Sequence, residues 1–521
     1  MHDIPSAVPM IFQIPIIEAI YLVANYGFNL RNMLRSTRKK LKTNIFKLPN
    51  LMALGPGEVI AVVHPAEQEK IYKKEKLLEL KVSLPESTIL IDGEDNLQNL
   101  TVGNTHSAVR KIYSSILSPR SLESFIPYAI SYFDQMWKDL ESMSQQQEEE
   151  EFDKKGSNNN NGSSKSLPHL RIVIRDCQLK LMCQILFGFT YETEDDQEQF
   201  AQFCHDFELC EAALFSASLK SQQFKKGYAA RERITKVLYD RFDRIYNERL
   251  ELFRGVDGER NKEVVQKRES SSVGNALITI ADSLIKDSLT GSKNDNGDIP
   301  KSKLFDVARG NLYLLLEASH ATTMQITTAM MYFLNHPDNT DTLKSVRNEL
   351  SQLKSDDNPS IVPNYEFFKT KMKFGDACIN EALRLAPIVG NVALQTSVNK
   401  TIQVNGHTIE GPVNFLFAHS HWYDDAETFP QPERFLPQRW IAGDELEASA
   451  FAKSTFKPFG DGRHICLGMN LARLVMKVNL YCFARNEDRK LTWDFDNVKI
   501  VDAFFPEKKV SDNFFVRVYS G

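Results

Sequence analysis

Hydrophobic residues recur at intervals of three and four along most of the chain, which is the spacing that lines one face of an α-helix. The pattern is strong over residues 169–252, and its longest uninterrupted run is Lys301–Asn335. It also predicts shorter helices over residues 104–117 and Ala276–Asp287. The sequence therefore predicts a mainly α-helical protein.

Runs of β-branched residues predict small β-sheets in two places. Residues 44–48 and 58–63 are such runs, and they bracket a turn with the sequence L-G-P-G. A helix is expected to begin directly afterwards, at His64-Pro65. After Pro387 the pattern changes from helical to β, over residues 392–420. The expected fold class is mainly α with small β-sheets.

Two polar regions interrupt these patterns. Residues 143–167 are rich in Gln, Glu, Asn and Ser, and residues 255–300 are polar with few hydrophobic positions. Such segments bury too little apolar surface to offset the entropy lost on ordering. We expect a single catalytic domain over residues 1–521, with a disordered low-complexity insertion at 143–167 and a variable loop region at 255–300.

Composition limits the function classes. Of 521 residues, 42% are hydrophobic and 25% charged, and the net charge of −5 gives no indication of nucleic acid binding. Seven cysteines occur without a C-x-x-C pair, which argues against a zinc site or a disulfide framework and favours a reducing compartment.

An apolar segment at residues 8–27 raises the question of membrane contact. Gln13, Pro15 and Glu18 interrupt it, so it lacks the ~20 apolar residues of a membrane span. No basic segment precedes it, which argues against a secretory signal. We predict an amphipathic helix from about Pro15 to the basic residues 35–42. It either packs on the protein or lies on a membrane surface.

The richest chemistry lies in F-G-D-G-R-H-I-C-L-G, residues 459–468, which a helical pattern follows. A glycine-rich turn permits close approach to a flat ligand and aims backbone N–H groups at the Cys466 sulfur. Those donors and a helix N-terminus favour thiolate over thiol. A lone cysteine in an apolar context is also commonly structural. Both interpretations stay open on this segment alone.

Two further motifs narrow the choice. Glu381 and Arg384 form E-x-x-R in a helical pattern, and P-x-R-aromatic follows at residues 437–440. The order of central helix, E-x-x-R, β-hairpins, P-x-R-aromatic and cysteine loop resembles the cytochrome P450 superfamily over nearly the whole chain. The resemblance implies the cytochrome P450 fold, with a long central helix over a haem b and the cysteine loop beneath it.

The resemblance also assigns residues to the haem site. Cys466 would be the axial thiolate ligand of the iron. Phe459 would pack against the porphyrin on the sulfur side, while Gly462 and Gly468 would allow the tight loop. The helix over residues 104–117 would contact the haem propionates through His106 and Arg110.

In the family, the E-x-x-R pair forms a buried network with an arginine downstream. The literal P-E-R-F at residues 432–435 is not the matching element, because alignment places P-x-R-F at residues 437–440. The resemblance therefore implies a network of Glu381, Arg384 and Arg439, and excludes Arg434.

Two departures from the family pattern concern the propionates. His464 stands where an arginine is usual, as in sterol 14-demethylases and their relatives, and a propionate contact is expected from it. The strand after E-x-x-R lacks the arginine often found there, so one propionate contact is expected to be either lost or replaced by Gln395.

The third departure concerns proton delivery. The central helix usually carries an acid next to an alcohol, and here the sequence is A-S-H-A-T-T, residues 318–323. In one register Ala321 replaces the acid, Thr322 and Thr323 supply hydroxyls, and His320 is a nearby proton donor. In the other register His320 takes the acid position and Ala321 the alcohol position. Bile-acid hydroxylases and prostacyclin synthases show a similar loss of the acid.

The resemblance implies a monooxygenase that inserts one oxygen atom of dioxygen into a lipophilic sterol, terpenoid, fatty acid or secondary metabolite. A haem-thiolate isomerase or dehydratase acting on a peroxide is the alternative, and a non-catalytic haem or ligand carrier is a third. Residues 316–323, 388–392 and parts of 200–230 are expected to line the pocket.

The resemblance also implies partners and a location. The expected electron donor is NADPH–cytochrome P450 reductase, with cytochrome b5 as a second donor. It would dock near the basic residues Lys453, Lys457, Arg473 and Lys477. The chain is expected to be a monomer at the cytosolic face of the endoplasmic reticulum membrane, or cytoplasmic.

Overall fold

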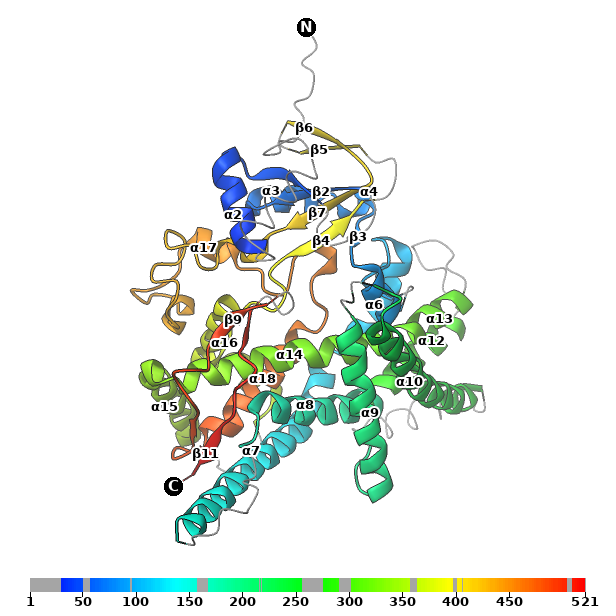
Figure 1. Ribbon diagram of the computed structural model, residues 1–521. Coiled ribbons are helices and arrows are strands. Elements are labelled where there is room, and N and C mark those ends of the chain that lie inside the picture. The colour runs from blue at the N-terminus through cyan, green and yellow to red at the C-terminus, as the bar shows by residue number, and fades with distance from the viewer. Residues whose placement is uncertain are drawn as a thin grey trace.

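The computed structural model describes residues 30–49, 57–93, 96–156, 167–214, 216, 218–254, 275–289, 301–356, 363–396, 401–404, 406–503 and 508–520. A large helical body carries a smaller part rich in β-strands at one end (Figure 1). The predicted fold class, mainly α with small sheets, is confirmed.

Helices make up most of the described chain. They are α2 Leu30–Leu41, α3 Pro65–Tyr72, α4 Glu75–Leu78, α5 Glu86–Asp92, α6 Asn104–Ser115, α7 Pro119–Gly156, α8 Leu170–Phe187, α9 Glu194–Ala213, α10 Gln222–Arg254, α12 Asn275–Leu289, α13 Lys301–Gly310, α14 Leu312–Asn335, α15 Thr340–Asp356, α16 Lys373–Leu385, α17 Ala450–Thr455 and α18 Met469–Ala484. The helices predicted over 169–252, 104–117 and from His64-Pro65 are confirmed by α8–α10, α6 and α3.

The strands form one five-stranded sheet and three two-stranded sheets. They are β1 Ile45–Leu48, β2 Glu58–Val62, β3 Lys81–Val82, β4 Val392–Gln395, β5 Thr401–Val404, β6 His407–Glu410, β7 Val413–Phe417, β8 Lys490–Thr492, β9 Ile500–Asp502, β10 Lys508–Val510 and β11 Arg517–Tyr519. The large sheet has the order β1-β2-β7-β4-β3, in which β2 and β7 are parallel. It joins the two strand regions predicted from sequence.

Helix α14 runs through the middle of the helical body, where it contacts α8, α16 and α18 (Figure 1). Most of its residues are buried, as expected for a helix with hydrophobic residues around much of its circumference. Packing of this kind fixes the position and rotation of α14, so the face it turns to the cavity described below is set by the core.

The helical run predicted over Lys301–Asn335 is broken in the structure. It forms α13 and α14, with Asn311 between them. The Asn311 side-chain amide donates to the Val307 carbonyl (2.6 Å), and its side-chain oxygen accepts from the Leu97 backbone N–H (2.6 Å). An asparagine side chain competes with the backbone for hydrogen bonds, which explains the interruption.

The disorder predicted for 143–167 is wrong for residues 143–156, which continue helix α7. Gln, Glu and Lys are strong helix formers, and the helix is already established by the buried residues before them. Ser144 is buried, where its hydroxyl donates to the Leu140 carbonyl and accepts from the Val518 N–H of β11. Residues 157–166 lie outside the described residues.

The variable region 255–300 is described only in part. Helix α12 confirms the helix predicted at Ala276–Asp287, whereas residues 255–274 and 290–300 lie outside the described residues. The apolar segment 8–27 also lies outside them. Of the helix predicted from about Pro15 to the basic residues 35–42, α2 confirms residues 30–41, and the part before residue 30 lies outside the described residues.

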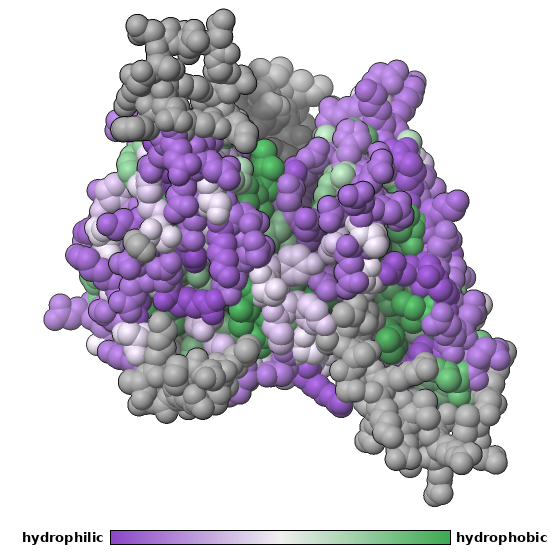
Figure 2. All heavy atoms as spheres, turned by 90° about the horizontal axis from the view of Figure 1, so that it is seen from below, coloured by the Kyte–Doolittle hydropathy of each residue, from purple (hydrophilic) through white to green (hydrophobic). Residues whose placement is uncertain are grey.

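No helix in the described part of the chain has the length and apolar character needed to cross a membrane. Seen from below, the described surface is mostly hydrophilic, and its hydrophobic side chains gather in hollows (Figure 2).

Candidate active site

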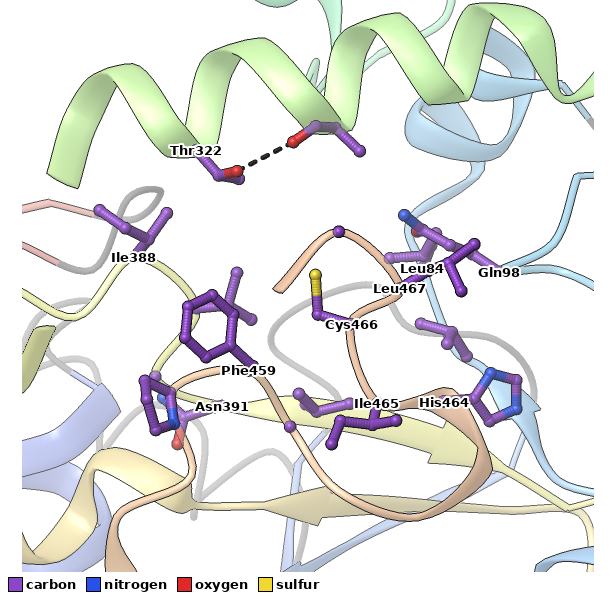
Figure 3. A pocket seen from close by; sticks show the side chains of 18 of the residues that line it. Leu84, Gln98, Thr322, Ile388, Asn391, Phe459, His464, Ile465, Cys466 and Leu467 are labelled. Carbon is purple, nitrogen blue, oxygen red and sulfur yellow. Dashed lines mark hydrogen bonds between the residues drawn. The ribbon is translucent and has the colours of Figure 1, made fainter. Parts of the chain in front are cut away.

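A cavity of about 940 Å³ lies between α14 and the cysteine loop, residues 459–468. Its size is near the upper end of small-molecule pockets in proteins. Figure 3 shows the Cys466 sulfur pointing into this space, with Thr322 of α14 on the opposite side. The sequence predicted both residues, and the fold brings them to facing walls of one cavity.

The cysteine loop is closed by backbone hydrogen bonds. The Cys466 N–H donates to the Phe459 carbonyl (2.8 Å), so the two ends of the turn are joined. The Arg110 guanidinium on α6 donates to the Ile465 carbonyl (2.7 Å). Helix α18 begins at Met469, directly after the loop, as the sequence predicted. The sulfur is therefore held at a helix N-terminus by contacts from three parts of the chain.

Opposing effects act on the Cys466 thiol. Burial raises its pKa above the ordinary value, and the backbone N–H groups of Gly468 and Met469 and the charge of Arg110, which act in the opposite direction, offset this only in part. The side chain lies deep in the protein and still opens onto the cavity, so it is accessible to a ligand there. Of the seven cysteines, all in the described part of the chain, only Cys466 lines the cavity.

Gly462 and Gly468 support the loop in different ways. Gly462 has a positive φ of +67°, and a Cβ there would lie 2.5 Å from the Tyr72 ring and 2.6 Å from the Glu75 carboxylate. A Cβ at Gly468 would lie 3.9 Å from the Cys466 sulfur, an ordinary contact. Gly462 is therefore required by the backbone, and Gly468 leaves the space beside the sulfur free.

Substituting Gly462 with alanine is expected to cost about 2–3 kcal/mol of folding free energy, because left-handed strain of about 1–2 kcal/mol adds to the clash. Gly460→Ala is the matched control, since Gly460 has φ +76° but no atom lies within 4 Å of the place that a Cβ would take. Urea unfolding should give a clearly larger loss for Gly462→Ala; equal losses would contradict the steric part of the argument.

Phe459 lines the cavity beside Cys466, and the Arg473 guanidinium lies 5.3 Å from the centroid of the Phe459 ring.

The basic cluster predicted for partner docking is only partly free at the surface. Lys477 is 5% exposed and forms an ion pair with Asp376 (2.9 Å), so its inclusion in a docking surface is wrong. Lys453 is paired with Glu447.

His106, Arg110 and His464 meet at the cavity wall next to the loop. The rings of His106 and His464 lie 4.8 Å apart between centroids, and the His464 Nε2 contacts the Leu80 carbonyl (3.3 Å). Burial lowers the pKa of both histidines to about 4, so both are neutral at pH 7. The His106 Nε2 is buried without a hydrogen-bond partner in the described structure. Because His106 lines the cavity, a ligand bound there could supply the missing hydrogen-bond partner.

Gln395, the candidate replacement for a missing arginine, does not line the cavity. On that segment the lining residues are 388–394, which include the whole range 388–392 predicted from sequence. Among the described residues of the range 200–230, Leu214 lines the cavity.

A buried ionic network lies behind the loop. Both Glu381 oxygens accept from the Arg384 guanidinium (2.7 and 3.0 Å), and Arg439 donates to one of them (3.1 Å). Trp440 Nε1 and the Leu436 N–H also donate to the carboxylate. Arg439 lies on the 3₁₀ helix Pro437–Trp440. The structure brings Arg439 to Glu381, whereas the Arg434 side chain is exposed and donates to Gln431.

The central helix turns one face to the cavity. Ala318, Ser319, Thr322, Thr323 and Ile326 line it, as expected for positions three and four apart. The Thr322 hydroxyl donates to the Ala318 carbonyl one turn earlier (2.9 Å), shown dashed in Figure 3.

His320 faces the other way, and the expectation of a proton donor there is wrong. Its ring is fully buried against Phe207, and its Nε2 contacts the Arg175 carbonyl (3.2 Å). The register with Ala321 in the acid position and Thr322 as alcohol agrees with the cavity-facing side of α14. Successive residues of an α-helix are rotated by about 100° around its axis, so His320 and Thr322, two positions apart, point in nearly opposite directions.

Several acidic residues near the cavity were not found by sequence reasoning, among them Asp92, Glu317 and Glu75. Asp92 and Glu317 line the cavity, and Glu75 accepts from the Arg463 N–H beneath the loop (2.6 Å). Burial raises the pKa of Glu75 to about 7. Glu317 gave a sequence signal as an acid within an apolar helix, but Asp92 and Glu75 lie in ordinary polar segments.

Comparisons with known proteins agree with this geometry. The family model of cytochrome P450 matches residues 20–486. A cytochrome P450 monooxygenase (orf3) of Eupenicillium brefeldianum is 30% identical over 228 residues, 42% of this chain and 42% of the relative. Cytochrome P450 26B1 of Xenopus tropicalis is 25% identical over 92% of this chain and 82% of the relative. The chain thus spans less than half of the first relative and most of the second.

A solved structure, the retinoic acid bound cyanobacterial CYP120A1, superposes with a TM-score of 0.69 at 20% identity, covering 99% of this chain and 100% of the other. This likeness concerns the fold. With the family model matching most of the sequence, the chain belongs to the cytochrome P450 family.

Membership in this family implies a haem held by a cysteine thiolate, and the described residues fit one. The Cys466 sulfur opens onto the cavity, and Gly468 leaves room beside it. Arg110 and the unpartnered Nε2 of His106 lie on the same wall, where they would serve haem propionates. A coordinated iron would favour the thiolate over the thiol.

Proposed function

We propose that this protein is a haem-thiolate monooxygenase that inserts one oxygen atom of dioxygen into a lipophilic small molecule. The observation that carries the proposal is the placement of the Cys466 sulfur and the Thr322 hydroxyl on facing walls of one cavity. Bound haem would supply the activation of dioxygen. The chain's own residues hold the cofactor, position the substrate and manage protons.

The residues take distinct parts in this proposal. Cys466 is the iron ligand, Phe459 packs beside it, and His106 and Arg110 hold the propionates as donors. The neutral His464 donates through Nε2 to the Leu80 carbonyl and packs against the His106 ring, so it supports the propionate side without a second donor. Thr322 presents a hydroxyl to the reacting side and passes a proton by donating and accepting at one oxygen. Ala321 supplies no carboxyl, so protons would reach Thr322 from water in the cavity.

The cavity suits a lipophilic substrate. Its wall includes Leu314, Leu315 and Ile326 of α14, together with Ile388 and Leu394. Apolar walls with a few polar groups are typical of small-molecule sites. Relatives include a trichothecene C-15 hydroxylase of Fusarium sporotrichioides. We propose a sterol, terpenoid, fatty acid or secondary metabolite as substrate.

The electrons would come from NADPH through a cytochrome P450 reductase, with cytochrome b5 as a second donor. We also propose that the protein is located at the cytosolic face of the endoplasmic reticulum and is a monomer. Fractionation of cells that express the native gene tests the location, and size-exclusion chromatography tests the monomeric state.

The deciding experiment measures NADPH consumption by the haem-loaded protein with a reductase and a panel of lipophilic compounds. Substrate-dependent consumption with a hydroxylated product supports the monooxygenase. The absence of an acid at Ala321 favours a second function, isomerisation or dehydration of a peroxide. Rapid turnover of a lipid hydroperoxide without reductant, and no NADPH-dependent product, would decide for that alternative.

Thr322→Ala is expected to raise the share of reducing equivalents lost as hydrogen peroxide several-fold, because the hydroxyl that manages the proton is removed. Product formation per NADPH measures this. The comparison variant is His320→Ala, whose side chain faces α8 and α9 and whose loss should leave this ratio unchanged. An increase in hydrogen peroxide with His320→Ala and none with Thr322→Ala would instead support the register in which His320 takes the acid position.

A further inference from the structure

Two carboxyl groups lie together on the wall of the cavity that the haem does not explain. Asp92 is the last residue of α5 and is 3% exposed, and Glu317 on α14 is 8% exposed. Both line the cavity. Glu317 is five residues before Thr322, which places it about 7.5 Å further along the helix axis. The pair therefore belongs to the substrate region and is displaced from the Cys466–Thr322 line.

These carboxyls lack the partners that buried acids normally have. The Asp92 Oδ1 is buried and accepts no hydrogen bond from the described residues. The nearby hydroxyls of Ser87 and Thr88 both donate to the Leu214 carbonyl instead (2.8 and 2.7 Å). A buried polar atom without a partner costs about 1–3 kcal/mol. Such an atom on a cavity wall indicates that a ligand supplies the partner.

Charge compensation from the protein is incomplete. Arg231 is the cation that acts on Asp92, but its Nε donates to the Ile91 carbonyl (3.2 Å) and its Nη1 pairs with Glu232 (2.6 Å). The charged neighbours that act on Glu317 are Asp92 and Glu211, both acidic. The local environment is therefore richer in acids than in bases.

The protonation of the pair reflects this surplus. Burial raises the pKa of Asp92 to about 7, and burial together with the charge of Asp92 raises the pKa of Glu317 well above its usual range. Two acids in this state hold protons that a bound cation would displace, since a positive charge favours both carboxylates. An anionic group would favour the protonated acids and gain no ion pair there, because Arg231 already contacts the Ile91 carbonyl and Glu232.

We propose that Asp92 and Glu317 form a subsite for the ammonium group of an otherwise lipophilic amine, and so orient it within the cavity. An ammonium can approach both groups, displaces their protons and pairs with the resulting carboxylates, whereas an alcohol satisfies one acceptor and leaves the acids protonated. The proposal rests on the proposed function, because it names the class of substrate for the same cavity. It makes Asp92 and Glu317 specificity-determining residues.

Three probes that each carry a ten-carbon chain test the subsite by equilibrium dialysis against the haem-loaded, full-length protein. They are decyltrimethylammonium, decanol and decanoate, all used below their aggregation concentrations. The quaternary cation has no lone pair and cannot bind iron. We expect the cation to bind about tenfold more tightly than decanol, and decanoate to bind most weakly.

Glu317→Gln and Asp92→Asn remove one charge each and keep the side-chain shape. Each should reduce the preference for the cation several-fold, and the double variant should abolish it while decanol binding is retained. Glu198→Gln is the control, because it makes the same exchange on an exposed position of α9. It should leave the order of the three probes unchanged.

Two results would overturn the subsite: no preference for the cation in the wild-type protein, or the same preference in the double variant. Retained decanol binding and a retained carbon-monoxide spectrum show that the variants are folded. The proposed function has its own failure criterion, which is the absence of a thiolate-type carbon-monoxide spectrum in the wild-type protein. Dialysis does not depend on that spectrum, so the two failures can be distinguished.

Discussion

Replacing Cys466 with alanine is expected to abolish the thiolate-ligated band in the carbon-monoxide difference spectrum of the reduced, haem-loaded protein. The reason is geometric, because no other cysteine of the chain lines the cavity, all seven being among the described residues. Monooxygenase activity should be lost with the band, since the thiolate pushes electron density toward O–O cleavage.

Cys378→Ala is the control for this experiment. Cys378 is fully buried in α16, and burial raises its pKa well above the usual value, so it is not available as a ligand. Its variant should keep the band. A band that survives Cys466→Ala would remove the basis of the proposed function.

Glu381→Ala is expected to destabilise the protein by about 3–5 kcal/mol, the usual cost of removing one partner from a buried ion pair. Arg384 and Arg439 are 1% and 2% exposed, and both would keep a buried charge without its carboxylate. Trp440 Nε1 would lose its acceptor as well. Urea unfolding of the haem-loaded variant measures the loss.

Arg439→Ala and Arg434→Ala form the matched pair for the same network. Arg439 donates to Glu381 (3.1 Å) and to the Gln431 carbonyl (2.7 Å), so its loss should also be large. Arg434 is exposed, and its substitution should change stability by no more than about 0.5 kcal/mol. Equal effects of the two substitutions would contradict the assignment of Arg439 to the network.

Local sequence patterns predicted the elements of the fold with few errors. The β-branched runs around residues 44–63 became β1 and β2, and the three- and four-residue hydrophobic spacing became α6, α8, α9 and α10. The errors arose where two local preferences competed. The polar residues 143–156 were assigned to a loop for their composition, and their helix propensity extends α7 instead.

The site shows the same division more sharply. Glycines, a cysteine and E-x-x-R lie in short motifs, so the loop and the Glu381–Arg384 pair were found from sequence. The direction of the side chains on α14 could not be fixed from sequence, because A-S-H-A-T-T can be aligned with the family motif in two registers. Packing of α14 against α8 and α9 fixes its rotation. That packing buries His320 and leaves Thr322 at the cavity.

The sequence by itself determined the fold class, the family resemblance and the identity of the cysteine loop, because each depends on residues close together in the chain. Only the tertiary structure decided which residues share the cavity. It brought Asp92 of α5 to Glu317 of α14, and Arg110 of α6 to the loop that ends at Gly468. Contacts between such distant segments depend on how whole helices pack, and no local pattern records that packing.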